Sequence, residues 1–373
     1  MKVILVGAAG YGSRYVEALI AGGDEPVKWI GVVDPYYERC ATKERIDSQN
    51  IPVYASLEEF YERDFADLVI ISTPTFLHKE ESILALSHGS YVLCEKPVAP
   101  TVADAMEMRL AEEKYDRFIA IGFQWSYAEA IQLLKRDILD GVLGAPVSFK
   151  TAISWPRNKR YYGRGGGWGG KIKKDGLVIN DSVASNACAH YIHNMLFVLG
   201  EDMKSSMEVD TFSAECYRAN PIESFDTCSI KLKTKSGVPL FFIASHATKT
   251  NRDPMFTYTF ENATVTFTEE KGAHIKATFK DGSVKDYGDP FLNNTKKLWD
   301  CLKAIKEGVS PICTVETAMP HTKFIERLFD NLTVENFPSE LIHVNEEIDA
   351  YYVEGLYEKM YSAYEKEMHF SEI

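Results

Sequence analysis

The sequence predicts two domains of different classes. The first is an α/β domain with a doubly wound parallel sheet, and the second is an α+β domain with a large, open, mostly antiparallel sheet. Over roughly the first 120 residues, short and continuously apolar runs alternate with helical stretches, as in parallel strands covered on both faces. After about residue 145 the runs lengthen and carry alternating or β-branched residues between turn signals, as in antiparallel strands. The length of 373 residues also fits two domains of about 150 residues or more each.

The elements of the first domain follow from its apolar runs. We expect strands at 3–6, 29–33, 68–72, 91–94 and 118–122, and helices near 15–20 and 102–114. A glycine-rich turn separates the first strand from the first helix. Residues 1–122 are therefore expected to form the first domain.

The second domain is expected to comprise residues 123–373, with a late helix able to pack back on the first domain. Its expected strands are 147–155, 207–217, 226–233, 240–248, 256–261, 263–268 and 274–279, and its expected helices are 189–199, 293–307 and 316–331. A glycine-rich loop at 163–170 interrupts the sheet. Several late tyrosines follow helical spacing in part and predict a further packed helix: Tyr351, Tyr352, Tyr357, Tyr361 and Tyr364.

Composition restricts the classes of partner. With 41 basic and 54 acidic residues the net charge is −13, which argues against nucleic acid or an anionic membrane as the main partner. No apolar run approaches the roughly 18–20 residues of a membrane helix, and the short apolar N-terminus lacks the features of a signal peptide. The seven cysteines are widely spread without a Cys-x-x-Cys pair, which predicts reduced thiols and a cytoplasmic location.

The turn after the first strand predicts a dinucleotide site. Glycine at this point lets the chain turn tightly and lets backbone N–H groups approach a pyrophosphate at the helix N-terminus. The motif departs from Gly-x-Gly-x-x-Gly because Ala9 takes the middle glycine position and Gly10 follows it. The residues expected to contact the cofactor here are Gly7, Ala9, Gly10, Tyr11 and Gly12.

An acidic residue supports this interpretation. Asp34 ends the second expected strand, 22 residues after Gly12, where a carboxylate binds the adenosine ribose hydroxyls. A carboxylate there would repel a 2′-phosphate. The sequence therefore predicts NAD, in preference to NADP, as the cofactor.

Two further segments carry a family resemblance. Residues 72–78 read Ser-Thr-Pro-Thr-Phe-Leu-His, and Glu95-Lys96-Pro97 follows a strand. Together with the glycine turn and Asp34, they resemble the Gfo/Idh/MocA oxidoreductases, closely over residues 1–150 and more loosely thereafter. The resemblance implies a Rossmann domain, an open-sheet domain, an active site between them, a cis Lys–Pro bond, and homodimers or homotetramers packed through the C-terminal sheet. It adds these cofactor-binding residues: Ser72, Thr73, Pro74, His78, Glu95, Lys96 and Pro97.

Lys96 and His190 are the expected catalytic residues. Lys96 would lie at a strand end beside a cationic nicotinamide, where an ammonium loses its proton more easily. His190 falls at the histidine of the family's Asp-x-x-x-His-x-x-Asp segment, in which Asn186 and His193 replace the two aspartates. Asn186, His193 and Asp181 are expected to support the site, with Asp181 able to supply a carboxylate. The spacing of His190 and His193 also fits two metal ligands, but no third accompanies them, so we predict no metal.

Substrate contacts are expected from two places. The segment 155–164 and the glycines after it combine basic and aromatic residues, which suits a loop that binds a sugar or an anionic group, although a linker or subunit contact has the same composition. Gln124 and Trp125 stand where family members often carry Asn-Arg, and Trp125 could offer a stacking surface. The expected substrate residues are Gln124, Trp125, Arg157, Arg160, Arg164 and Trp168.

These features predict an NAD(P)-dependent oxidoreductase that acts on a secondary hydroxyl of a sugar, cyclitol or sugar derivative. One alternative is redox-assisted glycoside cleavage with tightly bound, recycled NAD. Another is a non-catalytic NAD-binding sensor, although such a protein would not need Lys96 and His190. The expected partner is a small sugar or polyol, without nucleic acid or membrane.

Overall fold

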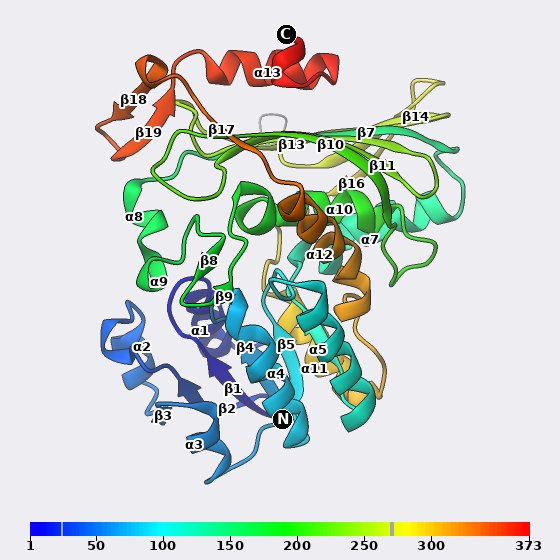
Figure 1. The fold of residues 1–373 in the computed structure, drawn as a ribbon. Coiled ribbons are helices and arrows are strands. Elements are labelled where there is room, and N and C mark those ends of the chain that lie inside the picture. Colours follow the sequence, from blue (N-terminus) through cyan, green and yellow to red (C-terminus); the bar gives the residue numbers. More distant parts are fainter. Residues whose placement is uncertain (24, 269–271) are drawn as a thin grey trace. The chain divides into compact units, whose positions relative to one another are not determined.

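The computed structural model describes residues 1–23, 25–268 and 272–373, and these residues form two compact units. The first unit comprises Met1–Tyr127 and Asn293–Thr322, and the second comprises Ala128–Leu292 and Lys323–Ile373. Figure 1 traces the chain through its elements.

The first unit contains the doubly wound parallel sheet that the sequence predicts. Its six strands have the order β3-β2-β1-β4-β5-β6, and all neighbouring strands run parallel. The elements are β1 (Lys2–Val6), α1 (Gly12–Ala21), β2 (Lys28–Val33), α2 (Lys43–Asp47), β3 (Val53–Tyr54), α3 (Leu57–Tyr61), β4 (Leu68–Ile71), α4 (His78–Ser87), β5 (Tyr91–Cys94), α5 (Val102–Tyr115), β6 (Ile119–Ile121), α6 (Gln124–Tyr127) and α11 (Lys296–Glu307). The short strand β3 carries no apolar run that would have predicted it.

A late helix completes the core of the first unit. Leu298, Cys301 and Leu302 of α11 are fully buried in one cluster with Val3 and Leu5 of β1. Their spacing places them on one apolar face of the helix. Residues 293–322 thus belong to the same unit as 1–127, whereas the sequence assigned everything after residue 122, apart from a helix packing back, to the second domain.

The second unit contains a nine-stranded mixed sheet in the order β16-β15-β14-β13-β7-β12-β11-β10-β17. Only the pairs β7–β12 and β10–β17 are parallel, so the predicted, mostly antiparallel sheet is confirmed. Its strands are β7 (Pro146–Ser154), β10 (Val209–Arg218), β11 (Thr227–Thr234), β12 (Pro239–Ser245), β13 (Arg252–Phe260), β14 (Ala263–Phe267), β15 (Ile275–Phe279), β16 (Val284–Gly288) and β17 (Val334–Asn336).

Helices lie on both faces of this sheet. Figure 1 shows α10 (Ala189–Val198) and α7 (Glu129–Leu139) on one face and α13 (Leu356–Lys366) on the other. Alternation along β12 explains the two layers, because Phe241 and Ile243 pack with α13 while Phe242 points to the opposite side. The remaining elements are α8 (Lys159–Tyr162), α9 (Arg164–Gly167), β8 (Lys173–Lys174), β9 (Leu177–Val178), α12 (Val315–Asp330), β18 (Ile342–Asn345) and β19 (Ala350–Val353).

The late tyrosines divide between two elements. Tyr357, Tyr361 and Tyr364 lie on α13 as their spacing predicts, but Tyr351 and Tyr352 lie on the strand β19. The prediction of a helix was wrong for these two residues, because tyrosine is also favoured in β-strands and these two lie in a β-hairpin.

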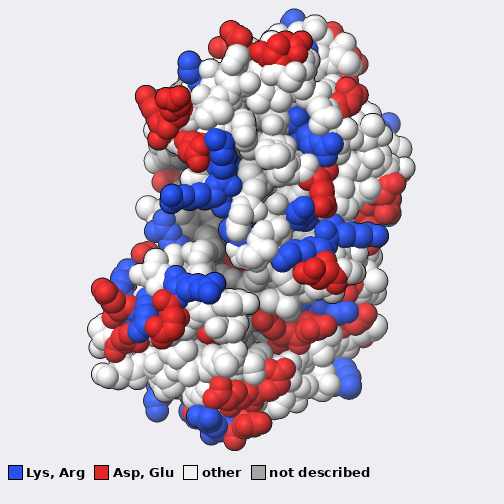
Figure 2. Space-filling view, turned by 60° about the vertical axis from the view of Figure 1, so that its left-hand side comes forward, with Lys and Arg blue, Asp and Glu red and all other residues white. Residues whose placement is uncertain are grey.

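The surface and the cysteines agree with the composition. Figure 2 shows Lys and Arg side chains interspersed with Asp and Glu on the face that it presents. All seven cysteines lie in the described residues as buried free thiols. None of the helices in the described part of the chain combines the length and apolar character of a membrane span.

Candidate functional site

The turn between β1 and α1 needs glycine for steric reasons. Gly7 has φ +82°, and a Cβ on it would lie 2.8 Å from the carbonyl oxygen of Ser72. A Cβ on Gly12 would lie 2.0 Å from the carbonyl oxygen of Gly7. Helix α1 therefore starts in close contact with the strand ends, while Ala9 and Gly10 between these glycines are exposed. This is the geometry that leaves backbone N–H groups of a helix N-terminus available to a diphosphate.

Asp34 braces this turn. It follows β2 directly and is 8% exposed. Its Oδ2 accepts a hydrogen bond from the backbone N–H of Ala8 at 3.0 Å, and its Oδ1 accepts one from the N–H of Tyr36 at 2.9 Å. The carboxylate is thus fixed beside the glycine turn, which is where the sequence expects it to bind ribose.

The buried side chain of His78 forms hydrogen bonds to the turn after β4 and to the turn after β5. Its side chain is 1% exposed. Nε2 lies 3.0 Å from the carbonyl oxygen of Thr73, and Nδ1 lies 3.0 Å from that of Pro97. The sequence placed His78 among the cofactor-binding residues, but this burial makes it a residue that positions the turns rather than one that presents its ring to a ligand.

Glu95, Lys96 and Pro97 follow β5. The Lys96–Pro97 bond is cis, as the family resemblance implies. Glu95 is 5% exposed, and its Oε1 accepts hydrogen bonds from the hydroxyl of Tyr15 at 2.6 Å and from the ammonium of Lys297. Its Oε2 accepts one from the backbone N–H of Lys96 at 3.3 Å. Glu95 therefore anchors the start of the turn, whereas the Lys96 side chain is partly exposed.

The sequence reasoning missed Lys297. Its side chain is fully buried, donates to the carbonyl oxygen of Gly122 at 3.0 Å, and lies 4.5 Å from the ring centre of Tyr11. Burial is the largest single influence on the pKa of Lys297 and lowers it, but Glu95 and Tyr11 together outweigh burial, so the net shift of the pKa is upward. The available signal was a lysine at helical spacing with Cys301, on the apolar face of α11.

Gln124 and Trp125, which were expected to bind substrate, contact other residues of the first unit. Gln124 accepts a hydrogen bond from the hydroxyl of Tyr11 at 2.9 Å and donates one to Asn294 at 3.1 Å. Gln124 thus supports Tyr11 at the glycine turn. Trp125 is 2% exposed, so its ring is packed in the protein and does not offer the expected stacking surface.

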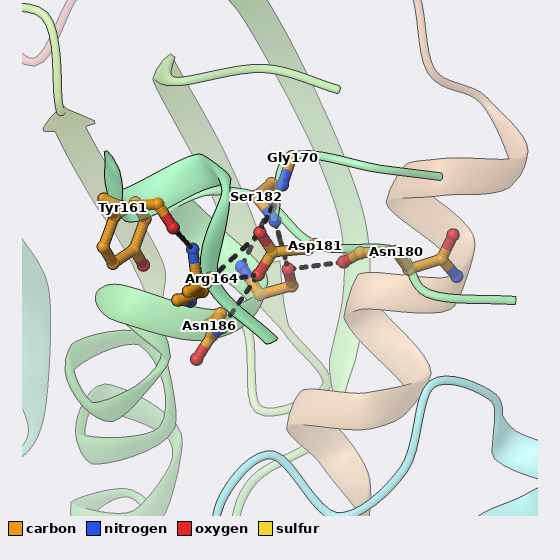
Figure 3. A network of polar contacts seen from close by, with 8 residues as sticks. Tyr161, Arg164, Gly170, Asn180, Asp181, Ser182 and Asn186 are labelled. Atoms are coloured by element: carbon orange, nitrogen blue, oxygen red, sulfur yellow. Dashed lines mark hydrogen bonds and ion pairs between the residues drawn. The ribbon is translucent and has the colours of Figure 1, made fainter. Parts of the chain in front are cut away.

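In the second unit, Asp181 and Asn186 lie together (Figure 3). Asp181 is 5% exposed; its Oδ1 accepts a hydrogen bond from Nδ2 of Asn186 at 2.8 Å and its Oδ2 accepts one from the N–H of Gly170 at 2.6 Å. A guanidinium nitrogen of Arg164 lies 3.4 Å from the same carboxylate. The asparagine that replaces the family aspartate therefore has a carboxylate as its direct neighbour.

Arg164 is held by its own loop. Its guanidinium lies 3.7 Å from the ring centre of Tyr161 and 4.2 Å from that of Trp168. A Cβ on Gly165 would lie 2.3 Å from Nε1 of Trp168, so the glycine run lets the chain wrap closely round these rings. Arg164 and Trp168 were expected to contact substrate, but in the structure they pack against each other within the loop.

The other basic residues of the loop differ in their surroundings. Arg157 lies 5.2 Å from the ring centres of both Trp155 and Tyr161, whereas Arg160 is exposed. Lys159 forms an ion pair with Asp349 at 2.7 Å. Arg157 and Arg160 thus remain the candidates of this segment for an anionic substrate group.

The two histidines of α10 have different environments. His193 is 1% exposed and stacks on Phe197 with ring centres 5.8 Å apart, so it is a core residue. His190, one turn earlier, is partly exposed. A π-helical turn at Val183–Ala187 precedes α10 and carries Asn186, and such turns occur frequently at functional sites. His193, which was expected to support the site, is thus packed in the core, whereas His190, the expected catalytic residue, is the more accessible of the two histidines.

Comparison with known proteins agrees with the fold and the nucleotide site. Residues 1–123 match the model of the family described as "Oxidoreductase family, NAD-binding Rossmann fold" (GFO_IDH_MocA). The chain is 31% identical over 142 residues to a 2,7-anhydro-N-acetylneuraminate hydratase of Mediterraneibacter gnavus, covering 37% of each chain. It is 32% identical over 146 residues to an inositol 2-dehydrogenase of Renibacterium salmoninarum, covering 39% of this chain and 43% of that one.

The solved structures show the likeness over a longer stretch. The WlbA dehydrogenase of Chromobacterium violaceum, in complex with NADH and UDP-GlcNAcA, has a TM-score of 0.74 at 22% identity, covering 88% of this chain and 92% of that one. The structural similarity covers 88% of the chain at the level of fold, and the family model matches within the first unit. Residues 1–123 are therefore an NAD-binding Rossmann domain of the Gfo/Idh/MocA oxidoreductase family.

Proposed function

We propose that the protein is an NAD-dependent oxidoreductase that transfers hydride between the nicotinamide and a secondary hydroxyl of a sugar, cyclitol or sugar derivative. The main support for the proposal is that three segments lie at the same end of the parallel sheet, where its strands have their carboxyl ends. Strands β1, β4 and β5 are adjacent and parallel, and Gly7, Ser72 and Lys96 follow their carboxyl ends. Ligands of doubly wound sheets bind outside this edge.

The glycine turn fits the diphosphate of NAD. Side chains at Gly7 and Gly12 would clash with the backbone at Ser72 and at Gly7, so glycine at these positions lets α1 start close to the strand ends. We assign NAD rather than NADP because the carboxylate of Asp34, fixed beside Ala8, would repel a 2′-phosphate. NAD, when bound, supplies the hydride acceptor at C4 of its nicotinamide ring.

We assign to Lys96 and His190 the transfer of the proton of the substrate hydroxyl. Lys96 is partly exposed after β5, and its backbone is held through Glu95. A lysine beside a cationic ring gives up its proton more easily and can then accept one from the hydroxyl. An imidazole such as His190 serves the same purpose near neutral pH. Asn186 can orient a hydroxyl but cannot take its proton.

The relatives support a carbohydrate-like substrate, because their names include an inositol dehydrogenase and a dehydrogenase that binds a UDP-sugar acid.

The test is a panel of inositols, aldoses, sugar alcohols and sugar acids with NAD and NADP, followed at 340 nm. Lys96→Met should lower turnover by about 10²-fold or more, as expected for loss of a proton-transfer group, and leave NADH affinity nearly unchanged. Lys28→Met, at an exposed lysine, is the matched control. Unaltered turnover of Lys96→Met would disprove the assignment.

A second candidate function is cleavage or hydration of a sugar with recycled NAD. The hydratase among the relatives favours it, because addition of water changes no net oxidation state. NAD would then be reduced and reoxidised within one turnover. Purified protein that retains NAD and converts a sugar without net absorbance change at 340 nm would favour this candidate over a dehydrogenase.

A further inference from the structure

Two parallel strands of the second unit end side by side and bring His246 next to the segment that follows β7. Strands β7 and β12 are paired with Ser154 opposite Ser245, and Trp155 and His246 follow these residues directly. The N–H of Trp155 donates to the carbonyl oxygen of Ser245 at 2.9 Å, and the N–H of Arg157 donates to that of His246 at 3.2 Å. Backbone hydrogen bonds therefore hold Arg157 and His246 as neighbours at this edge of the sheet.

The proton of the His246 ring has a fixed position. The side chain is 1% exposed, and its Nδ1 lies 2.8 Å from the carbonyl oxygen of Trp155. Because a carbonyl oxygen only accepts hydrogen bonds, Nδ1 carries the hydrogen. Burial, together with the nearby positive charge of Arg157, lowers the pKa of His246 well below its usual value, so the ring is neutral at neutral pH. Nε2 therefore carries a lone pair and can only accept a hydrogen bond.

This lone pair is an unmatched acceptor. Nε2 of His246 is buried and receives no hydrogen bond from the part of the chain that the structure describes. Nε of Arg157 is a donor in the same situation, since it is buried and has no acceptor among the described residues. Buried polar atoms of native proteins are nearly always hydrogen-bonded, so two neighbouring exceptions indicate a partner from outside the chain.

The ring of Tyr161 on α8 lies beside both groups. Its centre is 5.7 Å from the centre of the His246 ring and 5.2 Å from the guanidinium carbon of Arg157. The guanidinium carbon of Arg164 lies 3.7 Å from the same ring centre. The unmatched acceptor and the unmatched donor thus border one aromatic side chain.

The two arginines beside this ring differ in their counter-charges. Arg164 forms an ion pair with Asp181 at 3.4 Å. Arg157 is half-buried and forms no ion pair with a carboxylate of the described residues. His246 is neutral and adds no charge of its own. The positive charge of Arg157 therefore remains uncompensated, and a guanidinium in this state is suited to a carboxylate or a phosphate.

We infer that His246 and Arg157 bind one ligand, with a sugar hydroxyl donating to Nε2 of His246 and an anionic group of the same molecule accepting from Arg157. The inference rests on the proposed function and names the substrate class of that enzyme, which is a sugar that carries a carboxylate or a phosphate. The hydroxyl and the anion cannot exchange places, because an anion has no hydrogen to donate to Nε2 and is repelled by its lone pair. A neutral sugar leaves the charge of Arg157 unmatched.

The first experiment compares three forms of the same sugar: the neutral aldose, its uronic acid and its 6-phosphate. Glucose, galactose and mannose are each tested in all three forms with NAD, and turnover is followed at 340 nm. One of the anionic forms should have a kcat/KM at least about tenfold above that of its neutral sugar, as expected for one charge-assisted contact. The better anionic form distinguishes a carboxylate from a phosphate. Neutral sugars that are used as well as their anionic forms would overturn the inference.

Two variants test the two contacts separately. The amide nitrogen of asparagine is bonded to Cγ as Nδ1 is, so His246→Asn keeps a donor for Trp155 and loses Nε2. It should raise the KM of the preferred anionic sugar about tenfold, with kcat nearly unchanged. Arg157→Met should bring the kcat/KM of the anionic and neutral forms to about the same value. His274→Asn and Arg136→Met, at exposed positions of the second unit, are the matched controls. Equal KM values for His246→Asn and His274→Asn would overturn the inference.

Nitrogen-15 NMR of the unaltered protein covers the cases in which a variant fails to fold or no sugar is turned over. The ring of His246 should be neutral with its proton on Nδ1, and with NADH present its Nε2 resonance should shift on addition of an anionic sugar of the panel. The corresponding neutral sugar should have a much smaller effect. A proton on Nε2 would overturn the inference. An Nε2 resonance that no sugar of the panel shifts would also overturn it, because the lone pair then faces water only.

The inference and the proposed function fail in different ways. NAD-dependent turnover without a preference for anionic sugars would overturn the inference and leave the oxidoreductase in place. An anionic sugar that shifts the Nε2 resonance of His246, in a protein that oxidises no sugar with NAD, would remove the proposed function and support the binding site.

Discussion

The ammonium of Lys297 donates hydrogen bonds to the carboxylate of Glu95 and to the carbonyl oxygen of Gly122, although 202 residues separate Lys297 from Glu95 in the sequence. Because Glu95 also holds the backbone N–H of Lys96, this late helix supports the start of the proposed catalytic turn. The same ammonium lies over the ring of Tyr11 at the glycine turn. One buried charge thus connects the two segments that we assign to cofactor binding.

Lys297→Met should destabilise the protein by about 3–5 kcal/mol, because it leaves the carboxylate of Glu95 buried without a counter-charge. Urea unfolding measures the change. Lys303→Met, at an exposed position of the same helix, should stay within about 0.5 kcal/mol of the wild type. Combining Lys297→Met with Glu95→Gln should recover part of the loss, since the uncompensated charge is then absent. Equal effects at Lys297 and Lys303 would contradict the burial argument.

Asp34→Asn should shift cofactor preference toward NADP. Removing the negative charge removes the repulsion of a 2′-phosphate, while the amide oxygen can still accept the hydrogen bond from Ala8. Fluorescence titration with NADH and NADPH should show the ratio of their dissociation constants changing by about tenfold, or about 1.4 kcal/mol. Glu38→Gln, an exposed acid nearby, controls for the loss of one negative charge. A ratio that stays constant would place the ribose contact elsewhere.

Local patterns in the sequence predicted the nucleotide site because its residues follow strand ends directly. The glycine turn, Asp34 and Glu95-Lys96-Pro97 could each be located from the apolar run before them. Lys297 could not, since only the folded chain brings α11 to Glu95. Similarly, the sequence shows that Arg164 and Trp168 are close, but not that they stack on one another. Composition cannot distinguish a residue that faces a ligand from one that packs on its neighbour, as Trp125 and His193 also show.

Glu81 should make the stability of the protein fall as pH rises. Burial raises its pKa to about 7, while Oγ1 of Thr73 donates to the carboxylate at 2.5 Å. Between the ordinary glutamate pKa of 4.5 and about 7, the folded state keeps a proton that the unfolded state has released. The free energy of unfolding therefore decreases over this window, by at most about 1.4 kcal/mol per pH unit for one such group.

Glu81→Gln should flatten this decline, and the measurement is urea unfolding at intervals from pH 4.5 to 8. Glu62→Gln, at an exposed side chain that does not contribute to the raised pKa of Glu81, should leave the profile unchanged. Part of the slope should persist in Glu81→Gln because burial also raises the pKa of Glu112 to about 7. Identical profiles for the two variants would show that Glu81 is ionised in the folded protein at neutral pH.

Asn186→Asp, which restores the aspartate of the family pattern, should destabilise the second unit rather than improve the site. The new carboxylate would face Oδ1 of Asp181, which now accepts a hydrogen bond from Nδ2 of Asn186 at 2.8 Å. Two carboxylates at this distance repel each other, and Arg164 offsets only part of the repulsion because it already pairs with Asp181. We expect a loss of about 1–3 kcal/mol at pH 8 that becomes smaller at pH 5, where one of the two acids takes up a proton. Thermal unfolding at the two pH values measures this loss.

Asn158→Asp is the matched control, because Asn158 caps α8 and aspartate caps a helix equally well. A pH-independent loss in Asn186→Asp would show that geometry, and not charge, requires an asparagine beside Asp181.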